Sequence, residues 1–121
     1  DEKDAIQSAI AGLAARCDLV LTTGGTGLSP RDVTPEATAC LLDKELAGIP
    51  EAIRRQGCQY TDRAILTRGV AGSIGRSIVV NLPGSPKAVS QSLAYILPAL
   101  VHGSDILQGK VRDCAKKEEN V

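Results

Sequence analysis

The architecture of this chain is set by a short apolar segment that runs directly into a cluster of glycines, DLVLTTGGTG at residues 18–27. Residues 18–23 are rich in apolar and β-branched side chains, which predicts a short strand. The glycines end the strand, and Thr34-Pro35-Glu36 then opens a helix, because threonine is a favourable N-cap, proline suits the first helical position and glutamate favours the positive end of the helix dipole. The order strand, glycine loop, helix indicates an α/β layer, in which ligands bind beyond the carboxyl ends of the strands.

The other elements are predicted from the spacing of apolar residues and from the positions of glycine and proline. Further strands are expected at residues 64–67 and 76–82, with a glycine-containing loop at residues 69–75. Helices are expected at residues 4–15, at residues 34–45 where Gly48 ends the helix, and at residues 50–56. A long helix then begins at Ser85-Pro86 and is kinked by Pro98, and a short helix follows at residues 104–107.

This alternation predicts an α/β fold with a mainly parallel sheet, in one domain over residues 1–109. Residues 78–80 are continuously apolar, as expected of a strand covered on both faces. Domains of this class normally open with a strand, whereas this chain opens with a helix, so we expect a further strand upstream. Residues 110–121 are polar and charge-mixed and are expected to form a loose tail.

Composition narrows the classes of function. Fourteen basic and fourteen acidic residues cancel, and there are two aromatic residues, so the chain lacks the basic excess and the stacking platforms of a nucleic-acid binder. No apolar run approaches the roughly 18–20 residues that a membrane helix needs. The four cysteines have no Cys-x-x-Cys spacing and there is one histidine, which argues against a zinc site. Reduced cysteines in a cytoplasmic protein are expected instead.

Two loops rich in small residues are candidates for ligand binding, at residues 22–27 and 81–87. Glycines let the backbone approach a ligand and expose its N–H groups, and the helix beyond each loop adds partial positive charge. Both loops are therefore expected to bind phosphate or carboxylate, with Thr26 and Ser85 adding hydroxyl groups. The alternatives are a tight turn that binds nothing for the first loop and a plain helix cap for the second. The first loop lacks the Gly-Lys-Ser/Thr ending of a P-loop.

Four charged residues near these loops suggest how such a ligand is held. Asp32 could hold a hydrated magnesium ion against a substrate phosphate, or it could belong to the cap of the following helix. Arg31 could neutralise a phosphate or pair with Asp32. Arg68 ends the predicted strand at residues 64–67, on the edge where ligands bind. Lys87 opposes the dipole of its helix, so either a local anion accounts for it or it is simply solvated.

Several collinear segments resemble the MogA/MoaB family of molybdenum-cofactor biosynthesis proteins and the gephyrin G domain. They are LVLTTGGTG at residues 19–27, RDVTPEAT at 31–38, AILTRGVAG at 64–72, IVVNLPGSPKA at 78–88 and ILPAL at 96–100. The resemblance covers roughly residues 1–109 and is far more specific than a single glycine motif. The Arg31-Asp32-Val33-Thr34 pattern favours the adenylyltransferase branch over competence-damage-type relatives and cofactor-insertion domains.

The resemblance implies a three-layer Rossmann-like sandwich with a mostly parallel sheet, here without its N-terminal strand, that assembles as a homotrimer. It also implies that molybdopterin binds at the two loops and that AMP is transferred from Mg-ATP to the terminal phosphate of the pterin, giving AMP-molybdopterin and pyrophosphate. A downstream molybdate-insertion protein or domain would receive the product.

The resemblance assigns roles to individual residues. Asp32 matches the aspartate that the chemistry requires and is the expected magnesium ligand, with Asp1 as a second acidic candidate. The positions expected to bind substrate are Gly24, Gly25, Thr26, Gly27, Arg31, Arg68, Gly84, Ser85, Pro86 and Lys87. Two other functions stay open, a molybdopterin-binding module without turnover and an oligomerising interaction domain of the gephyrin type.

Overall fold

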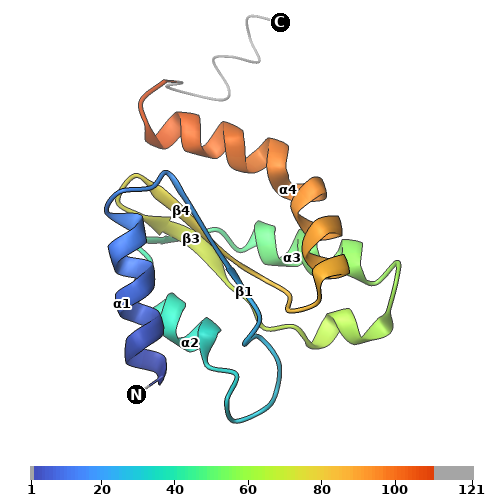
Figure 1. Ribbon diagram of the computed structural model, residues 1–121. Coiled ribbons are helices and arrows are strands. Elements are labelled where there is room, and N and C mark those ends of the chain that lie inside the picture. The colour runs from blue at the N-terminus through green and yellow to red at the C-terminus, as the bar shows by residue number, and fades with distance from the viewer. Residues whose placement is uncertain (1, 111–121) are drawn as a thin grey trace, which may run out of the picture.

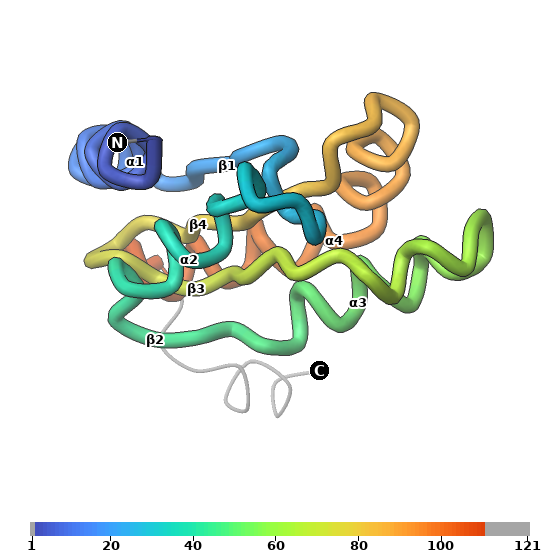
Figure 2. The backbone as a smooth tube through the Cα atoms, turned by 90° about the horizontal axis from the view of Figure 1, so that it is seen from below, coloured from blue at the N-terminus to red at the C-terminus, as the bar shows by residue number. Residues whose placement is uncertain are grey.

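The computed structural model describes residues 2–110 as a four-stranded sheet with helices against both faces (Figure 1). The strands are β1 (Leu19–Thr23), β2 (Lys44–Glu45), β3 (Ala71–Ile74) and β4 (Ser77–Leu82), in the spatial order β1-β4-β3-β2 (Figure 2). The helices are α1 (Glu2–Ala14), α2 (Thr34–Ala39), α3 (Gly48–Gly57), the 3-10 helix η1 (Asp62–Leu66) and α4 (Pro86–Leu107). The predicted α/β class is confirmed. The sheet is mixed rather than mostly parallel, because β4 pairs in parallel with β1 but β3 pairs antiparallel with both β4 and β2.

Two apolar clusters, one on each face of the sheet, hold the layers together. Strand β4 contributes to both, because its alternate side chains point to opposite faces. Ile78, Val80 and Leu82 pack against α3 and α4. Val79 lies on the other face, where it packs with Ile10 of α1, and α2 contacts α1 on that side. All of β4 is buried, and this burial on both faces accounts for its almost continuously apolar sequence.

Most predicted elements are confirmed with small changes in their bounds, namely α1, β1, α3, β4 and α4. Residues 104–107 are the last turn of α4 rather than a separate helix, and Gly48 begins α3 instead of ending the helix before it. Pro98 lies inside α4, whose axis changes direction partway along (Figure 1), as expected where proline removes a backbone hydrogen bond. No helix within residues 2–110 is both long and apolar enough to cross a bilayer. The predicted tail, beyond Lys110, lies outside the described residues.

The helix predicted at residues 34–45 is too long, since α2 ends after six residues. The chain then turns and pairs with β3. Asp43 N–H donates to Ser73 O at 2.7 Å, and Leu46 N–H donates to Ala71 O at 2.9 Å. These sheet contacts outweigh the helix propensity of the segment, which is a weak preference.

The strand predicted at residues 64–67 is wrong, because most of that segment lies in η1. Ile65 and Leu66 are 67% and 52% exposed, so this apolar run is not a core strand, and runs of this length do not distinguish strand from helix. The loop expected at residues 69–75 contains β3, which forms a hairpin with β4. Gly75 has φ +59° at the first central position of the two-residue turn, where a type II′ turn requires a positive φ.

Candidate functional site

The two glycine loops lie side by side at the carboxyl ends of β1 and β4. The last residues of these strands, Thr23 and Leu82, are partners in the parallel register, and Gly24 N–H donates to Leu82 O at 3.2 Å. A Cβ added to Gly84 would lie 3.4 Å from Gly24 Cα, so the absence of side chains lets the two backbones approach each other. The loops therefore meet at one edge of the sheet, where ligands bind in open α/β sheets.

The first loop has a backbone shape that favours glycine at two positions. Gly24 and Gly25 have φ of +82° and +71°, in the left-handed region. Gly25 O accepts a hydrogen bond from Thr34 N–H at 3.2 Å, and a Cβ on Gly25 would clash with Thr34 Oγ1. The loop is thus folded against the first turn of α2.

Asp32 lies between the first loop and α2, and its carboxylate is held by the segment that joins them rather than by the helix. Asp32 Oδ2 accepts from Ser29 N–H at 3.0 Å and lies 2.8 Å from where a Cβ of Gly27 would be. The N-cap of α2 is Val33, which makes no side-chain cap bond, so neither Asp32 nor Thr34 caps this helix as expected. Within the described residues Asp32 Oδ1 accepts no hydrogen bond, which leaves one carboxylate oxygen for a ligand.

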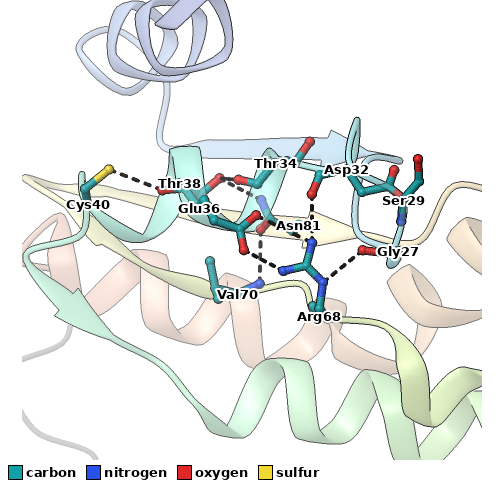
Figure 3. A network of polar contacts seen from close by, with 10 residues as sticks. All are labelled: Gly27, Ser29, Asp32, Thr34, Glu36, Thr38, Cys40, Arg68, Val70 and Asn81. Carbon is teal, nitrogen blue, oxygen red and sulfur yellow. Dashed lines mark hydrogen bonds and ion pairs between the residues drawn. The ribbon is translucent and has the colours of Figure 1, made fainter. Parts of the chain in front are cut away.

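Arg68 reaches across to the first loop and to α2 (Figure 3). Its Nε donates to Gly27 O at 2.8 Å, and its Nη2 donates to Asp32 O at 2.7 Å. Its Nη1 donates to Glu36 Oε2 at 2.5 Å in an ion pair with α2, while its backbone N–H donates to Thr26 O at 2.9 Å. The side chain predicted to bind substrate is therefore engaged by groups of the protein.

The ion pair changes the acidity of Glu36. The hydrogen bond from Arg68 lowers the pKa of Glu36 below its ordinary value of 4.5, and the charge of Lys3 on α1 acts weakly in the same direction. The Glu36 and Arg68 side chains are 47% and 33% exposed, so water screens their attraction. The pair contributes more by its geometry than by its charge.

Arg31 stands apart from this network. Its side chain is exposed, and it makes no ion pair with Asp32. Of the two roles considered for Arg31, pairing with Asp32 is therefore wrong. Its guanidinium stays available to a phosphate.

Asn81 connects the strands and α2 close to where the loops begin. It is 3% exposed, and its Nδ2 donates to Thr22 Oγ1 of β1 at 2.9 Å and to Thr38 Oγ1 of α2 at 3.0 Å. Its Oδ1 accepts from Val70 N–H at 3.1 Å. A buried amide with partners on three sides fixes the relative positions of β1, β4, α2 and the chain entering β3.

Asn81 and Leu82 of the second loop belong to β4, and its remaining residues, 83–87, are held by a helix cap. Ser85 is the N-cap of α4, and its Oγ accepts from Ala88 N–H at 3.0 Å, with Pro86 in the first turn as predicted. Gly84, Ser85, Pro86 and Lys87 are exposed, and Lys87 makes no ion pair with a described residue. The cap is confirmed, and the loop is open to solvent.

Two hollows flank the paired loops. A groove of about 360 Å³ between α1 and β1 includes Gly24, Gly25 and Arg31 in its lining. A cavity of about 210 Å³ between α3, η1 and the start of α4 is lined in part by Pro83 and Ser85. Four of the predicted site residues therefore line a hollow, three of them in the groove and one, Ser85, in the cavity.

Seven predicted site residues line neither hollow, namely Thr26, Gly27, Asp32, Arg68, Gly84, Pro86 and Lys87. Thr26 is buried, at 4% exposed, and its carbonyl belongs to the Arg68 network. Gly27 and Asp32 belong to the same network. Thr26, Gly27, Asp32 and Arg68 shape the first loop from within the protein, while Oδ1 of Asp32 accepts no hydrogen bond from a described residue.

A closed metal site is not formed by the described residues, since residues 2–110 contain no group of three or more histidine, cysteine, aspartate or glutamate side chains that could hold an ion. Magnesium that is bound to a nucleotide needs fewer protein ligands, because it typically takes one or two carboxylates together with phosphate oxygens and water. Asp32 Oδ1 fits that requirement. Asp1, the second acidic candidate, lies outside the described residues.

Sequence reasoning does not identify two residues of this network, Glu36 and Asn81. An asparagine in an otherwise apolar strand is a signal that could identify Asn81, because a buried amide requires hydrogen-bond partners. Glu36 carries no comparable signal, since a glutamate in the first turn of a helix is already explained by the helix dipole.

Comparison with known proteins gives close relatives over most of the chain. Residues 1–102 match the family model described as a probable molybdopterin binding domain. The chain is 39% identical over 119 residues to the molybdopterin adenylyltransferase of Helicobacter pylori, covering 97% of this chain and 68% of that protein. It is 45% identical over 113 residues to the molybdenum cofactor synthesis protein cinnamon of Drosophila melanogaster, covering 88% of this chain and 19% of that protein.

Comparison with solved structures indicates the same family. The crystal structure of the molybdopterin biosynthesis enzyme MoaB from Thermus thermophilus superposes with a TM-score of 0.81 and 48% identity, over 88% of this chain and 69% of that one. The family match includes both glycine loops, Asp32 and Arg68. By its sequence and its fold, the chain belongs to the molybdopterin-binding domain family that includes the MogA and MoaB proteins and gephyrin.

Proposed function

We propose that this chain is a molybdopterin adenylyltransferase domain, which transfers AMP from Mg-ATP to the terminal phosphate of molybdopterin and releases pyrophosphate. The observation that carries the proposal is the pairing of two glycine loops beside a carboxylate oxygen that no residue within 2–110 engages. Backbone N–H groups in such loops, at the starts of helices, bind phosphate, and this reaction brings together the phosphates of two substrates. The name of the Helicobacter pylori relative supports the same reaction.

Each loop has its own role in the proposal. In the first loop, Gly24 and Gly25 present the backbone to a phosphate, and Arg31 neutralises charge from the adjoining groove. In the second loop, the exposed Lys87 does the same, and Ser85 can donate its hydroxyl proton because its oxygen accepts, rather than donates, the cap bond. The remaining substrate-contact candidates are Thr26, Gly27, Gly84 and Pro86, whose backbones form the two loops.

The reaction depends mainly on how the protein positions the two substrates. An oxygen of the pterin phosphate attacks the α-phosphorus of ATP, and the bond from that phosphorus to the bridging oxygen of pyrophosphate breaks. Such transfers need little covalent help from the protein, so alignment and charge neutralisation carry the catalysis. Magnesium, when bound with ATP, supplies neutralisation of the phosphates. Asp32 Oδ1 would anchor that ion, and the protein cations lie on the same edge of the sheet.

The proposal extends to assembly, location and partners. We infer a homotrimer in the cytoplasm, and exposed apolar side chains supply candidate contact surfaces: Ile65, Leu66, Tyr95, Leu97 and Val101. The product would pass to a molybdate-insertion protein or domain, and a match to 19% of cinnamon fits a domain that can form part of a longer protein. Light scattering coupled to size exclusion checks the trimer.

The reaction is tested by incubating the purified protein with molybdopterin and Mg-ATP and measuring AMP-molybdopterin and pyrophosphate by mass spectrometry. Asp32→Asn keeps the shape of the side chain and removes its charge. We expect turnover to fall by roughly 100-fold or more, with pterin binding largely unchanged. Asp105→Asn, near the other end of α4, is the matched control and should retain turnover.

The outcomes separate the functions that were left open. Unchanged turnover in Asp32→Asn would contradict the role of that carboxylate. Pterin binding without product in the wild type would place the chain among binding modules without turnover. A trimer that survives Asp32→Asn while turnover is lost would separate assembly from catalysis.

A further inference from the structure

We propose that Arg68 is a positioning residue, which holds the first glycine loop and Asp32 in the geometry required for transfer without touching substrate. The inference rests on the function proposed above and deepens it. The guanidinium of Arg68 joins three residues of the segment that runs from the first loop into α2, namely Gly27, Asp32 and Glu36 (Figure 3).

Arg68 donates hydrogen bonds to the two residues at the ends of one short segment. Gly27 O and Asp32 O, which accept from Nε at 2.8 Å and from Nη2 at 2.7 Å, bracket the four residues 28–31 between them. A planar group bonded to both carbonyls fixes their separation, because the directions of its N–H bonds are rigid. Between these two carbonyls, Ser29 N–H holds the carboxylate of Asp32. Arg68 therefore positions that carboxylate indirectly, because it donates to the Asp32 backbone and not to its side chain.

Glu36 anchors the guanidinium to α2. It accepts from Nη1 at 2.5 Å and more weakly from Nη2 at 3.5 Å. Loss of the Glu36 charge would remove this anchor and leave both carbonyl bonds in place. We therefore expect Glu36 to matter less than Arg68.

The side chain can be tested apart from the backbone at this position. The Arg68 N–H donates to Thr26 O at 2.9 Å, and any side-chain variant keeps that bond. Arg68→Lys keeps the charge but offers a single ammonium group on a flexible stem. Lysine would therefore preserve a role that depends on charge alone. It would not preserve a role that requires hydrogen bonds to both Gly27 O and Asp32 O.

A direct substrate contact by Arg68 is the competing explanation. A residue that binds substrate acts independently of Asp32, so its loss should raise KM and should add to the effect of Asp32→Asn. A residue that positions Asp32 should lower kcat and should have little further effect once the Asp32 charge is gone. A double-mutant cycle distinguishes these cases.

The experiment compares wild type, Arg68→Lys, Arg68→Ala and Glu36→Gln, with Arg55→Ala as the control. Arg55 is exposed on α3, and its side chain makes no hydrogen bond or ion pair with described residues. Hydrogen exchange of residues 24–34 is measured without substrate, and kcat and KM are measured with it. We expect faster exchange in this segment for both Arg68 variants, kcat lower by roughly 100-fold, and a smaller loss for Glu36→Gln. Arg55→Ala should match the wild type in both measurements.

Three results would overturn the inference: wild-type kcat in Arg68→Lys, unchanged exchange at residues 24–34, or additive effects of Arg68→Lys and Asp32→Asn. Should Arg68→Ala fail to fold, Arg68→Lys and Glu36→Gln still decide the question. Absence of product in the wild type would defeat the proposed function alone, since the exchange measurement needs no substrate and still reports whether Arg68 holds the loop.

Discussion

The two glycine loops share one edge of the sheet but are stabilised in different ways. Residues 24–34 are fastened by backbone and side-chain bonds from Thr34, Ser29 and Arg68. The second loop is exposed and is held by the cap bond of Ser85. A loop with many internal bonds presents one geometry, whereas a loop with few can adjust to its ligand. Glycine content alone does not separate these cases, because the partners that stiffen a loop come from other elements.

The largest difference in stability should appear when a glycine in each loop is replaced by alanine. Gly25→Ala places a Cβ at φ +71° and against Thr34 Oγ1, which should lower the free energy of unfolding by about 3 kcal/mol and abolish turnover. Gly84→Ala meets only Gly24 Cα at 3.4 Å and should cost less than about 1 kcal/mol. Urea unfolding of both variants measures the difference, and equal losses would show that the loops are equally constrained.

Asn81→Ala should cause the next largest loss of stability, because the Asn81 side chain joins β1, α2 and the chain entering β3 next to the first loop. The hydroxyls of Thr22 and Thr38 and the N–H of Val70 would lose their shared partner. The cost of buried polar groups left without partners predicts a loss of about 2 kcal/mol. Thermal unfolding measures it, and a variant as stable as the wild type would mean that water replaces the amide.

Ser85→Ala tests the second loop. It removes the one cap bond, to Ala88 N–H, and should lower the free energy of unfolding by about 1 kcal/mol, the usual value of a helix N-cap. Gly retains most capping ability, so Ser85→Gly is the matched control and should lose less. A loss above that of Asn81→Ala would reverse the proposed order of the two loops.

The smallest effect is a pH dependence from Glu36. Its pKa is lower in the folded protein than its ordinary value of 4.5, chiefly through the bond from Arg68, so the folded state binds fewer protons than the unfolded state. The ion pair thus stabilises the fold above that value, and its contribution is lost as the pH falls through the folded pKa. Because both partners are partly exposed, we expect less than about 1 kcal/mol. Denaturation of wild type and Glu36→Gln between pH 7 and 3 should converge toward low pH.

Local signals in the sequence were sufficient for the elements that frame the site. The apolar run ending at Thr23, the glycines that follow and Pro35 each act on their own neighbours, so strand, loop and helix start could be predicted in order. Ser85 and Pro86 likewise marked the start of α4, and the buried run at residues 78–80 marked the central strand. The position of Asp32 between the first loop and α2 was also a local prediction, whereas its role came from the resemblance to a known family, which no periodicity could supply.

The tertiary structure alone decided which segments pair and which distant side chains come together at the site. Residues 44–45 became a strand because β3 offered backbone partners, whereas residues 62–66 form η1 outside the sheet. Arg68 is 41 residues from Gly27, and Asn81 is 59 residues from Thr22. Hydrogen bonds over such separations depend on the packed arrangement of the whole sheet, and no local pattern of residues encodes them.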